Sequence, residues 1–470
     1  MKGSTMASIN KKKTAPTVTT FEGAVVKKNN DSEEILRRTV MTCMLWEKAF
    51  YESGKSISDR IKRLIPEVKP ERVAEIALEA RSMMKLRHAP LFIAREMARI
   101  ETHKHLVARL LEEIIQRPDE MSELLAIYWA DGKNQPISSQ IKRGLAKAFT
   151  KFNEYSLAKY KKDDKDISIR DVLFLSHARP KTGVKGFDKK ARKNGVMTPS
   201  DEGSQLFKRV VDQTMSTPDT WEVEISKAGN NAESWTRLLN EKKLGGLALL
   251  RNLRNCITAK VAMELLRGAI KSMKTERILP FRFIAAARYA PDLEPELEEA
   301  MYKCIEDKQK LKGLTALLVD ISGSMKEKLS SKSDMIRTDA AYGLAILARE
   351  LCENIQVYSF SNNLVKIAPR RGFALRDAIN NSQIHSGTSL GKALQDLNST
   401  VKYDRLIIIT DEQSQDSIPK AVVSKSYIIN IASCENGVGY GDYNHINGWS
   451  EAVLDFIRVY EEGFNAESRD

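Results

Sequence analysis

Apolar residues over the first two thirds of the chain recur with the spacing of amphipathic helices. They fall at i, i+3, i+4 and i+7, so each set lines one helical face. Two such sets are Val73, Ile76, Ala77, Ala80 and Met84, and Val107, Leu110, Leu111 and Ile114. Because proline and glycine separate these segments, we expect stacked helical pairs, an α solenoid, over residues 31–310. An irregular all-α domain is the alternative.

The pattern changes at residue 311, after a charged segment at residues 306–310. Short, almost continuous apolar runs now alternate with helical segments, which predicts a parallel, doubly wound α/β sheet. The expected strands are residues 314–319, 355–360, 406–410 and 426–431, and the expected helices are residues 338–353 and 450–459. In such a sheet the ligand site lies at the carboxyl ends of the strands.

These patterns divide the chain into three parts: residues 1–30, 31–310 and 311–470. The first is polar, rich in Lys, Thr and Asn, and lacks periodicity, which predicts a flexible or weakly docked tail. No secretory signal and no apolar run long enough to cross a membrane is apparent in the sequence. The five cysteines are scattered without C-x-x-C spacing, so we expect no disulfide framework and a cytoplasmic protein without membrane association.

Charge is distributed unevenly between the two large parts. Residues 1–310 hold 58 Lys and Arg against 42 Asp and Glu, a net charge of +16, whereas residues 311–470 hold 17 against 20, a net charge of −3. A basic helical part favours a polyanionic partner such as nucleic acid, because cations near phosphates release condensed counterions.

Oxygen-bearing side chains gather where the α/β strands are expected to end. Asp320, Ser322 and Ser324 follow the first strand in a D-x-S-x-S pattern, Thr388 precedes a helix, and Asp411 follows another strand. Carboxylates and hydroxyls are ligands for a hard cation such as Mg²⁺. A strand-ending turn with serine caps is the structural alternative for D-x-S-x-S alone.

The three-part pattern resembles the metal-ion-dependent adhesion site of von Willebrand factor A domains. The resemblance implies that Ser322, Ser324 and Thr388 contact Mg²⁺ or another divalent cation, while Asp320 and Asp411 act largely through water. It also implies a protein partner that supplies an acidic side chain. Since no general base, nucleophile or phosphate loop accompanies these residues, we expect an adhesive site rather than an enzyme.

Basic and aromatic side chains cluster between residues 142 and 181. Lys and Arg can hold phosphates while aromatic rings stack on unpaired bases, so this segment predicts an RNA-binding surface. The candidate residues are Lys142, Arg143, Lys147, Lys159, Lys161, Lys162, His177 and Lys181. For His177, a hydrogen-bonded structural role is the alternative.

This segment, together with residues 247–255 and 277–283, resembles the TROVE module shared by Ro, telomerase and vault proteins. Ro-like proteins place this module directly before a von Willebrand A domain, and residues 448–457 are similar to the family's closing helix. The resemblance implies a ring of HEAT-like helical repeats, closed by the A domain, with a positively charged hole. It assigns RNA contacts to Lys159, to Lys161 or Lys162, and to His177.

The resemblance further implies a monomeric, non-catalytic scaffold or RNA chaperone. Proteins of this kind bind small structured Y RNAs on the outer basic face and accept the single-stranded ends of misfolded RNAs through the hole. Bacterial relatives can be tethered by Y RNA to an exoribonuclease. The alternative is a metal-dependent protein adaptor in which the helical module binds a protein partner instead of RNA.

Overall fold

The computed structural model describes residues 17–42, 51–132, 135–160, 166–180, 202–275, 278, 280–306, 308–331, 333–432, 434–450 and 452–467. The helices of the first two thirds pack in two groups. The first group encloses a hydrophobic core that runs from Leu36 to Val210. Its helices are α1 (Ser32–Thr42), α2 (Gly54–Leu64), α3 (Pro70–Ser82), α4 (His88–Met97), α5 (Val107–Ile114), α6 (Asp119–Tyr128), α7 (Ser139–Phe149), α8 (Glu154–Lys159), α9 (Ile169–Ser176) and α10 (Glu202–Val211).

The second group follows a connection without helix or strand, residues 214–220. Its helices are α11 (Trp221–Ala228), α12 (Ala232–Asn240), α13 (Gly246–Thr258), α14 (Met263–Ser272), α15 (Phe281–Ala287) and α16 (Glu294–Lys303). Their buried side chains, from Trp235 onward, belong to a different core from that of the first group. The helical module, α1–α16, is thus a stack of helices with one break.

A six-stranded sheet begins at Leu311. Its strands are β3 (Leu311–Asp320), β4 (Cys352–Phe360), β5 (Leu364–Lys366), β6 (Arg405–Thr410), β7 (Ser426–Asn430) and β8 (Asn444–Asn447), in the spatial order β5-β4-β3-β6-β7-β8. All neighbours are parallel except the edge strand β5, which pairs antiparallel with β4. The prediction of a parallel sheet is therefore confirmed, and the antiparallel edge strand β5 is an additional strand that the sequence pattern did not indicate.

Helices cover both faces of this sheet, which we call the A domain together with α17–α20. These helices are α17 (Arg337–Leu351), α18 (Gly372–Asn380), α19 (Leu390–Thr400) and α20 (Ala452–Glu467). Alternation along β3 assigns Leu317 and Val319 to the core with α17 and α20, and Ala316 and Leu318 to the core with α19. The doubly wound α/β prediction is confirmed.

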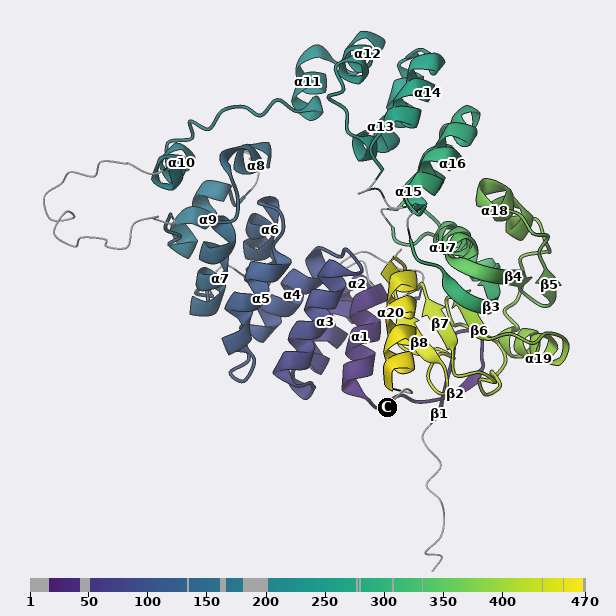
Figure 1. The fold of residues 1–470 in the computed structure, drawn as a ribbon. Coiled ribbons are helices and arrows are strands. Elements are labelled where there is room, and N and C mark those ends of the chain that lie inside the picture. Colours follow the sequence, from purple (N-terminus) through teal and green to yellow (C-terminus); the bar gives the residue numbers. More distant parts are fainter. Residues whose placement is uncertain are drawn as a thin grey trace, which may run out of the picture.

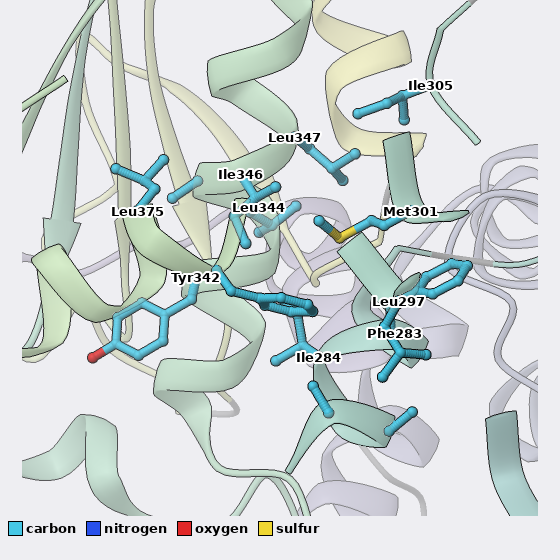
Figure 2. Packing of buried hydrophobic residues seen from close by; sticks show 14 of the residues in the cluster. Phe283, Ile284, Leu297, Met301, Ile305, Tyr342, Leu344, Ile346, Leu347 and Leu375 are labelled. Carbon is cyan, nitrogen blue, oxygen red and sulfur yellow. The ribbon is translucent and has the colours of Figure 1, made fainter. Parts of the chain in front are cut away.

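The elements follow one another around a ring (Figure 1). Helix α1 lies beside α20 and β8, so the first helices of the chain meet the A domain (Figure 1). At the other end of the module, α15 packs on α17 and α16 packs on α15 and α18. Figure 2 shows Leu297 and Met301 of α16 in one cluster with Phe283 of α15 and Leu347 of α17. Because one hydrophobic core runs through this second junction, α13–α16 and the A domain share buried side chains.

Residues 17–27 differ from the expected flexible or weakly docked tail. Strands β1 (Thr17–Thr19) and β2 (Val25–Lys27) form an antiparallel hairpin. Thr20 lies in its turn and donates a hydrogen bond from Oγ1 to Ser414 O at 2.6 Å, while Ala24 is buried in the α19-side core of the sheet. The hairpin is therefore docked on the A domain.

The described residues contain no helix both long and apolar enough to span a membrane. Among the cysteines that the structure describes, Cys256, Cys304, Cys352 and Cys434 are all free thiols.

Candidate functional site

The predicted metal residues meet at the carboxyl edge of the central strands. Strands β3 and β6 are parallel neighbours, so Asp320 at the end of β3 and Asp411 just after β6 lie at the same edge of the sheet. Gly323 N donates to Ser386 O at 2.8 Å, and Gln415 N donates to Thr388 O at 2.9 Å. These backbone hydrogen bonds tie the three loops that carry the five residues to one another.

Asp320 is fully buried and bonded only to neutral donors among the described residues. Its Oδ1 accepts from Ser322 N at 2.8 Å, and its Oδ2 accepts from Thr410 Oγ1 at 2.6 Å. Burial, together with the nearby charge of Asp411, raises the pKa of Asp320 to about 7. A cation bound here would stabilise the ionised form.

The carboxylate of Asp411 has a different environment. Its Oδ2 accepts from Ser324 Oγ at 2.7 Å and from the Tyr51 hydroxyl at 2.7 Å, and it pairs with Arg337 Nη1 at 3.0 Å. Its Oδ1 accepts from Gln413 N at 3.2 Å. Sequence reasoning missed Tyr51 and Arg337, because neither lies within the D-x-S-x-S, Thr or Asp segments of the motif.

The donor set fits a hard divalent cation. Ser322 Oγ and Ser324 Oγ lie 3.4 Å apart, and with Thr388 and the two carboxylates they offer only oxygen atoms. Within the described part of the chain there is no cluster of three or more His, Cys, Asp and Glu side chains suited to a metal. The five-residue assignment stays a prediction, and three of its members are hydroxyl-bearing.

A buried ion pair lies directly beside this site. Arg38, on α1, donates from Nη1 to Glu412 Oε2 at 2.5 Å and from Nε to Cys434 O at 2.6 Å. His445 on β8 also contacts the Glu412 carboxylate. Burial would raise the pKa of Glu412, but the charges of Arg38 and His445 outweigh it and hold that pKa at about 2. Helix α1 is thus anchored to the A domain at the residue after Asp411.

The glycine-rich segment from Gly437 to Gly441 forms a loop that packs against this ion pair. Gly439 N lies 3.3 Å from Glu412 Oε2 and donates to it. A Cβ atom at Gly437 or Gly439 would overlap the Glu412 carboxylate. The glycines therefore serve close backbone packing around a buried carboxylate.

Three predicted RNA-binding residues lie on α7. Lys142 is partly exposed, and Arg143 and Lys147 are exposed. Lys147 pairs with Glu112 at 2.7 Å, so part of its charge is already neutralised. No ion pair of Lys142 or Arg143 is found among the residues described by the structure. Their charge is available to an external anion.

Lys159 and His177 lie on neighbouring helices of the same group. Lys159 is exposed in the last turn of α8. His177 caps α9 in a left-handed conformation with φ of 54°, and its side chain is exposed. Within the described residues no hydrogen bond of its ring is found, and its role in RNA binding stays a prediction. Lys161, Lys162 and Lys181 lie outside the described residues.

Exposed aromatic side chains accompany these cations. Tyr155 on α8 and Phe174 on α9 are each 52% exposed. The Arg170 guanidinium lies over the Phe174 ring, 5.6 Å from its centroid. Both aromatics fall in the segment that sequence reasoning selected, but a sequence pattern alone cannot distinguish them from core residues such as Phe149.

Comparisons with known proteins point to one family. A TROVE domain matches residues 208–342, a range that includes α11–α16 and the D-x-S-x-S segment but not α7–α9. Telomerase protein component 1 of Rattus norvegicus is 22% identical over 338 residues, which cover 56% of this chain and 13% of that protein. The same component of Mus musculus is 37% identical over 86 residues, covering 17% of this chain and 3% of that protein. The chain therefore spans only a small part of these relatives.

The fold is similar to the crystal structure of the Deinococcus radiodurans Ro (Rsr) protein. That similarity has a TM-score of 0.55 at 17% sequence identity and covers 92% of this chain and 100% of the Deinococcus chain. It extends over both the helical module and the A domain, so the expected helical ring with a von Willebrand A-type domain is confirmed as the fold. Together, the TROVE match over residues 208–342, the telomerase-component relatives and this fold show that the chain is similar to Ro-like proteins of the TROVE family.

Proposed function

We propose that this protein binds RNA without catalysing a reaction on it, as a scaffold or chaperone for RNA. The observation that carries the proposal is the surface of α7–α9, where Lys142, Arg143 and Lys159 lie in the same helical group as the exposed rings of Tyr155 and Phe174. The cations would hold phosphates, and the rings would stack on unpaired bases.

The ligand class follows from the Ro-like fold and from this surface. We propose small structured, Y-like RNAs and the single-stranded ends of misfolded RNAs as ligands, since exposed cations suit folded backbones and exposed aromatics suit unpaired ends. The protein would act in the cytoplasm as a monomer, and an exoribonuclease is a candidate partner. The net charge of +16 on residues 1–310 supports a polyanionic ligand.

The A domain would hold Mg²⁺ through Ser322, Ser324 and Thr388, with Asp320 and Asp411 supporting it. This proposal rests on the buried Asp320 carboxylate, which has no cationic partner among the described residues. A bound divalent cation would offer a coordination position to an acidic group of a protein partner.

Charge reversal tests the RNA surface directly. A variant with Lys142, Arg143 and Lys159 changed to Glu should bind a small hairpin RNA with a single-stranded 3′ end at least about tenfold more weakly at moderate salt, because phosphate contacts are lost. The slope of log affinity against log salt should also become shallower, by about 0.7–0.9 for each lost phosphate contact. Fluorescence anisotropy over a salt series measures both quantities.

The matched control reverses three exposed lysines of the A domain, Lys366, Lys402 and Lys420, which gives the same change in net charge. This variant should keep near-native RNA affinity. Equal losses of RNA affinity in the two variants would show that net charge alone causes the effect. Unchanged RNA affinity in the variant of Lys142, Arg143 and Lys159 would contradict the assignment of the RNA surface to α7–α9. If the native protein binds no RNA, the metal-dependent adaptor becomes the better account.

A further inference from the structure

The contacts of Asp411 carry an inference about how the proposed metal site is controlled. Oδ2 of this carboxylate accepts from three donors that come from three separate segments: Ser324 in the D-x-S-x-S loop, Arg337 at the start of α17, and Tyr51 just before α2. Only Ser324 belongs to the metal-binding pattern. The other two contribute a positive charge and a hydroxyl donor.

The positive charge of Arg337 neutralises the Asp411 carboxylate through a buried ion pair. Both side chains are almost completely buried, with 2% and 0% exposure. The guanidinium also donates from Nη1 to Ser324 O at 3.3 Å, so it is bonded to the loop that carries two of the proposed ligands. A buried cation at this position competes electrostatically with any second cation bound to the same carboxylate.

Tyr51 belongs to the helical module rather than to the A domain. Its hydroxyl donates to Asp411 Oδ2 at 2.7 Å, and its ring lies under the Arg337 guanidinium at 4.6 Å from the centroid. Phe21 of the docked hairpin packs against the same ring, with centroids 5.0 Å apart. The side chain is therefore held in place from two sides.

The same part of the helical module contacts the A domain at residues adjacent to Asp411 and Tyr51. Arg38 pairs with Glu412, the residue next to Asp411. Glu52, next to Tyr51, accepts a hydrogen bond from Glu435 N at 2.9 Å. The contacts of Asp411, Glu412 and Glu435 with the helical module thus belong to one junction.

We propose that Arg337 and Tyr51 form an internal plug on the proposed metal site, by which we mean that both side chains occupy the Asp411 carboxylate. A divalent cation must displace them from Asp411 in order to bind. Cation binding therefore weakens the junction between α1–α2 and the A domain. The inference rests on the proposed metal site and describes how cation binding at that site is regulated. In this account the helical module fills the position where an acidic group of a protein partner would otherwise approach the site.

The test measures Mg²⁺ binding to the full-length protein by isothermal titration calorimetry. Arg337→Gln should bind Mg²⁺ at least about tenfold more tightly than the native chain, because one competing buried charge is removed. Tyr51→Phe should bind it more tightly by a smaller factor, since only a hydroxyl is lost. Matched controls are Arg371→Gln, which removes an exposed cation paired with Glu350, and Tyr358→Phe, which removes a hydroxyl bonded to Gln356. Both should bind as the native chain does.

A second readout follows the junction itself. Hydrogen exchange of the amides in α2 should accelerate when Mg²⁺ is added to the native protein, and in Tyr51→Phe it should be faster even without Mg²⁺. If circular dichroism shows that Arg337→Gln is misfolded, the Mg²⁺ affinity and the α2 hydrogen exchange of Tyr51→Phe test the proposal instead.

The possible failures are distinguishable. Native and plug variants that bind Mg²⁺ equally, with α2 exchange unaffected by the cation, would overturn the plug and leave the metal site standing. Absence of Mg²⁺ binding in every variant would overturn the metal site and the plug together. Neither result bears on RNA binding, since all of these substitutions lie outside α7–α9.

Discussion

Among single residues, Glu412 lies in one of the most closely packed sites of the chain's described part. Glu412 is completely buried, adopts a left-handed backbone conformation with φ of 61°, and is surrounded by Arg38, His445 and two glycines. In the sequence these glycines form a G-x-G-x-G segment that lacks the following helix of a dinucleotide-binding pattern, which indicates only a loop. Only the fold shows that they make room for a carboxylate from a segment far away in the chain.

Gly439→Ala should therefore destabilise the protein. A Cβ atom there would lie 2.7 Å from His445 Nε2 and would also overlap Glu412. We expect a loss of about 1–3 kcal/mol in the free energy of unfolding, as for other overpacked buried sites. Urea denaturation followed by circular dichroism measures it.

The matched control for this substitution is Gly268→Ala on α14, where a Cβ atom would meet no atom within 4 Å. Because alanine favours helix over glycine, this variant should be as stable as the native chain or more stable, by up to about 1 kcal/mol. Equal behaviour of the two variants would contradict the close packing at Gly439.

Most helices and strands could be predicted from the sequence, and the elements that could not are short or lie at a sheet edge. The fully buried strand predicted at residues 406–410 corresponds to β6, Arg405–Thr410, because a continuous apolar run between turns has few other solutions. Strand β8 was missed, since its sequence is Asn-His-Ile-Asn and it lies at the sheet edge. Strands β1 and β2 were missed because each has only three residues.

Helix α9 begins with a capping box, a local arrangement of two side chains that stabilises the start of a helix. Ser168 and Asp171 form a capping box: Asp171 N donates to Ser168 Oγ at 3.2 Å, and Ser168 N donates to Asp171 Oδ2 at 2.8 Å. This cap fixes the start of the helix that carries Phe174 and His177.

Ser168→Ala should reduce the free energy of unfolding by about 1 kcal/mol, the usual effect of losing such a cap. Thermal unfolding compared with Ser156→Ala provides the measurement and its control, because Ser156 contributes its backbone N–H rather than its side chain to the cap of α8. A smaller loss at Ser168 than at Ser156 would show that α9 does not depend on the cap.

At the scale of the whole molecule, the ring closes through two unlike junctions. Helices α15 and α16 share a hydrophobic core with α17, whereas α1 and the segment before α2 meet the A domain largely through ion pairs and hydrogen bonds near Asp411. The order of the modules and the three loops of the proposed metal site could be predicted from the sequence, since each depends on local pattern. Tyr51, Arg38 and the break at residues 214–220 could not, because they depend on contacts or gaps that only the folded ring defines.

The basic helical surface supports the proposal that this ring binds RNA on its helical module. RNA binding is the central element of that account. It depends on cations that are exposed on the folded surface rather than consumed by internal ion pairs, as Lys147 partly is.

The most direct test is to purify the tagged, full-length protein from its own cells, wash it at moderate salt and sequence the RNA that remains bound. The account predicts enrichment of a few small hairpin RNAs, or of RNAs with free 3′ ends, over a parallel purification of the Lys142, Arg143 and Lys159 charge-reversal variant. RNA recovery no greater than from that variant, or none above background, would contradict it.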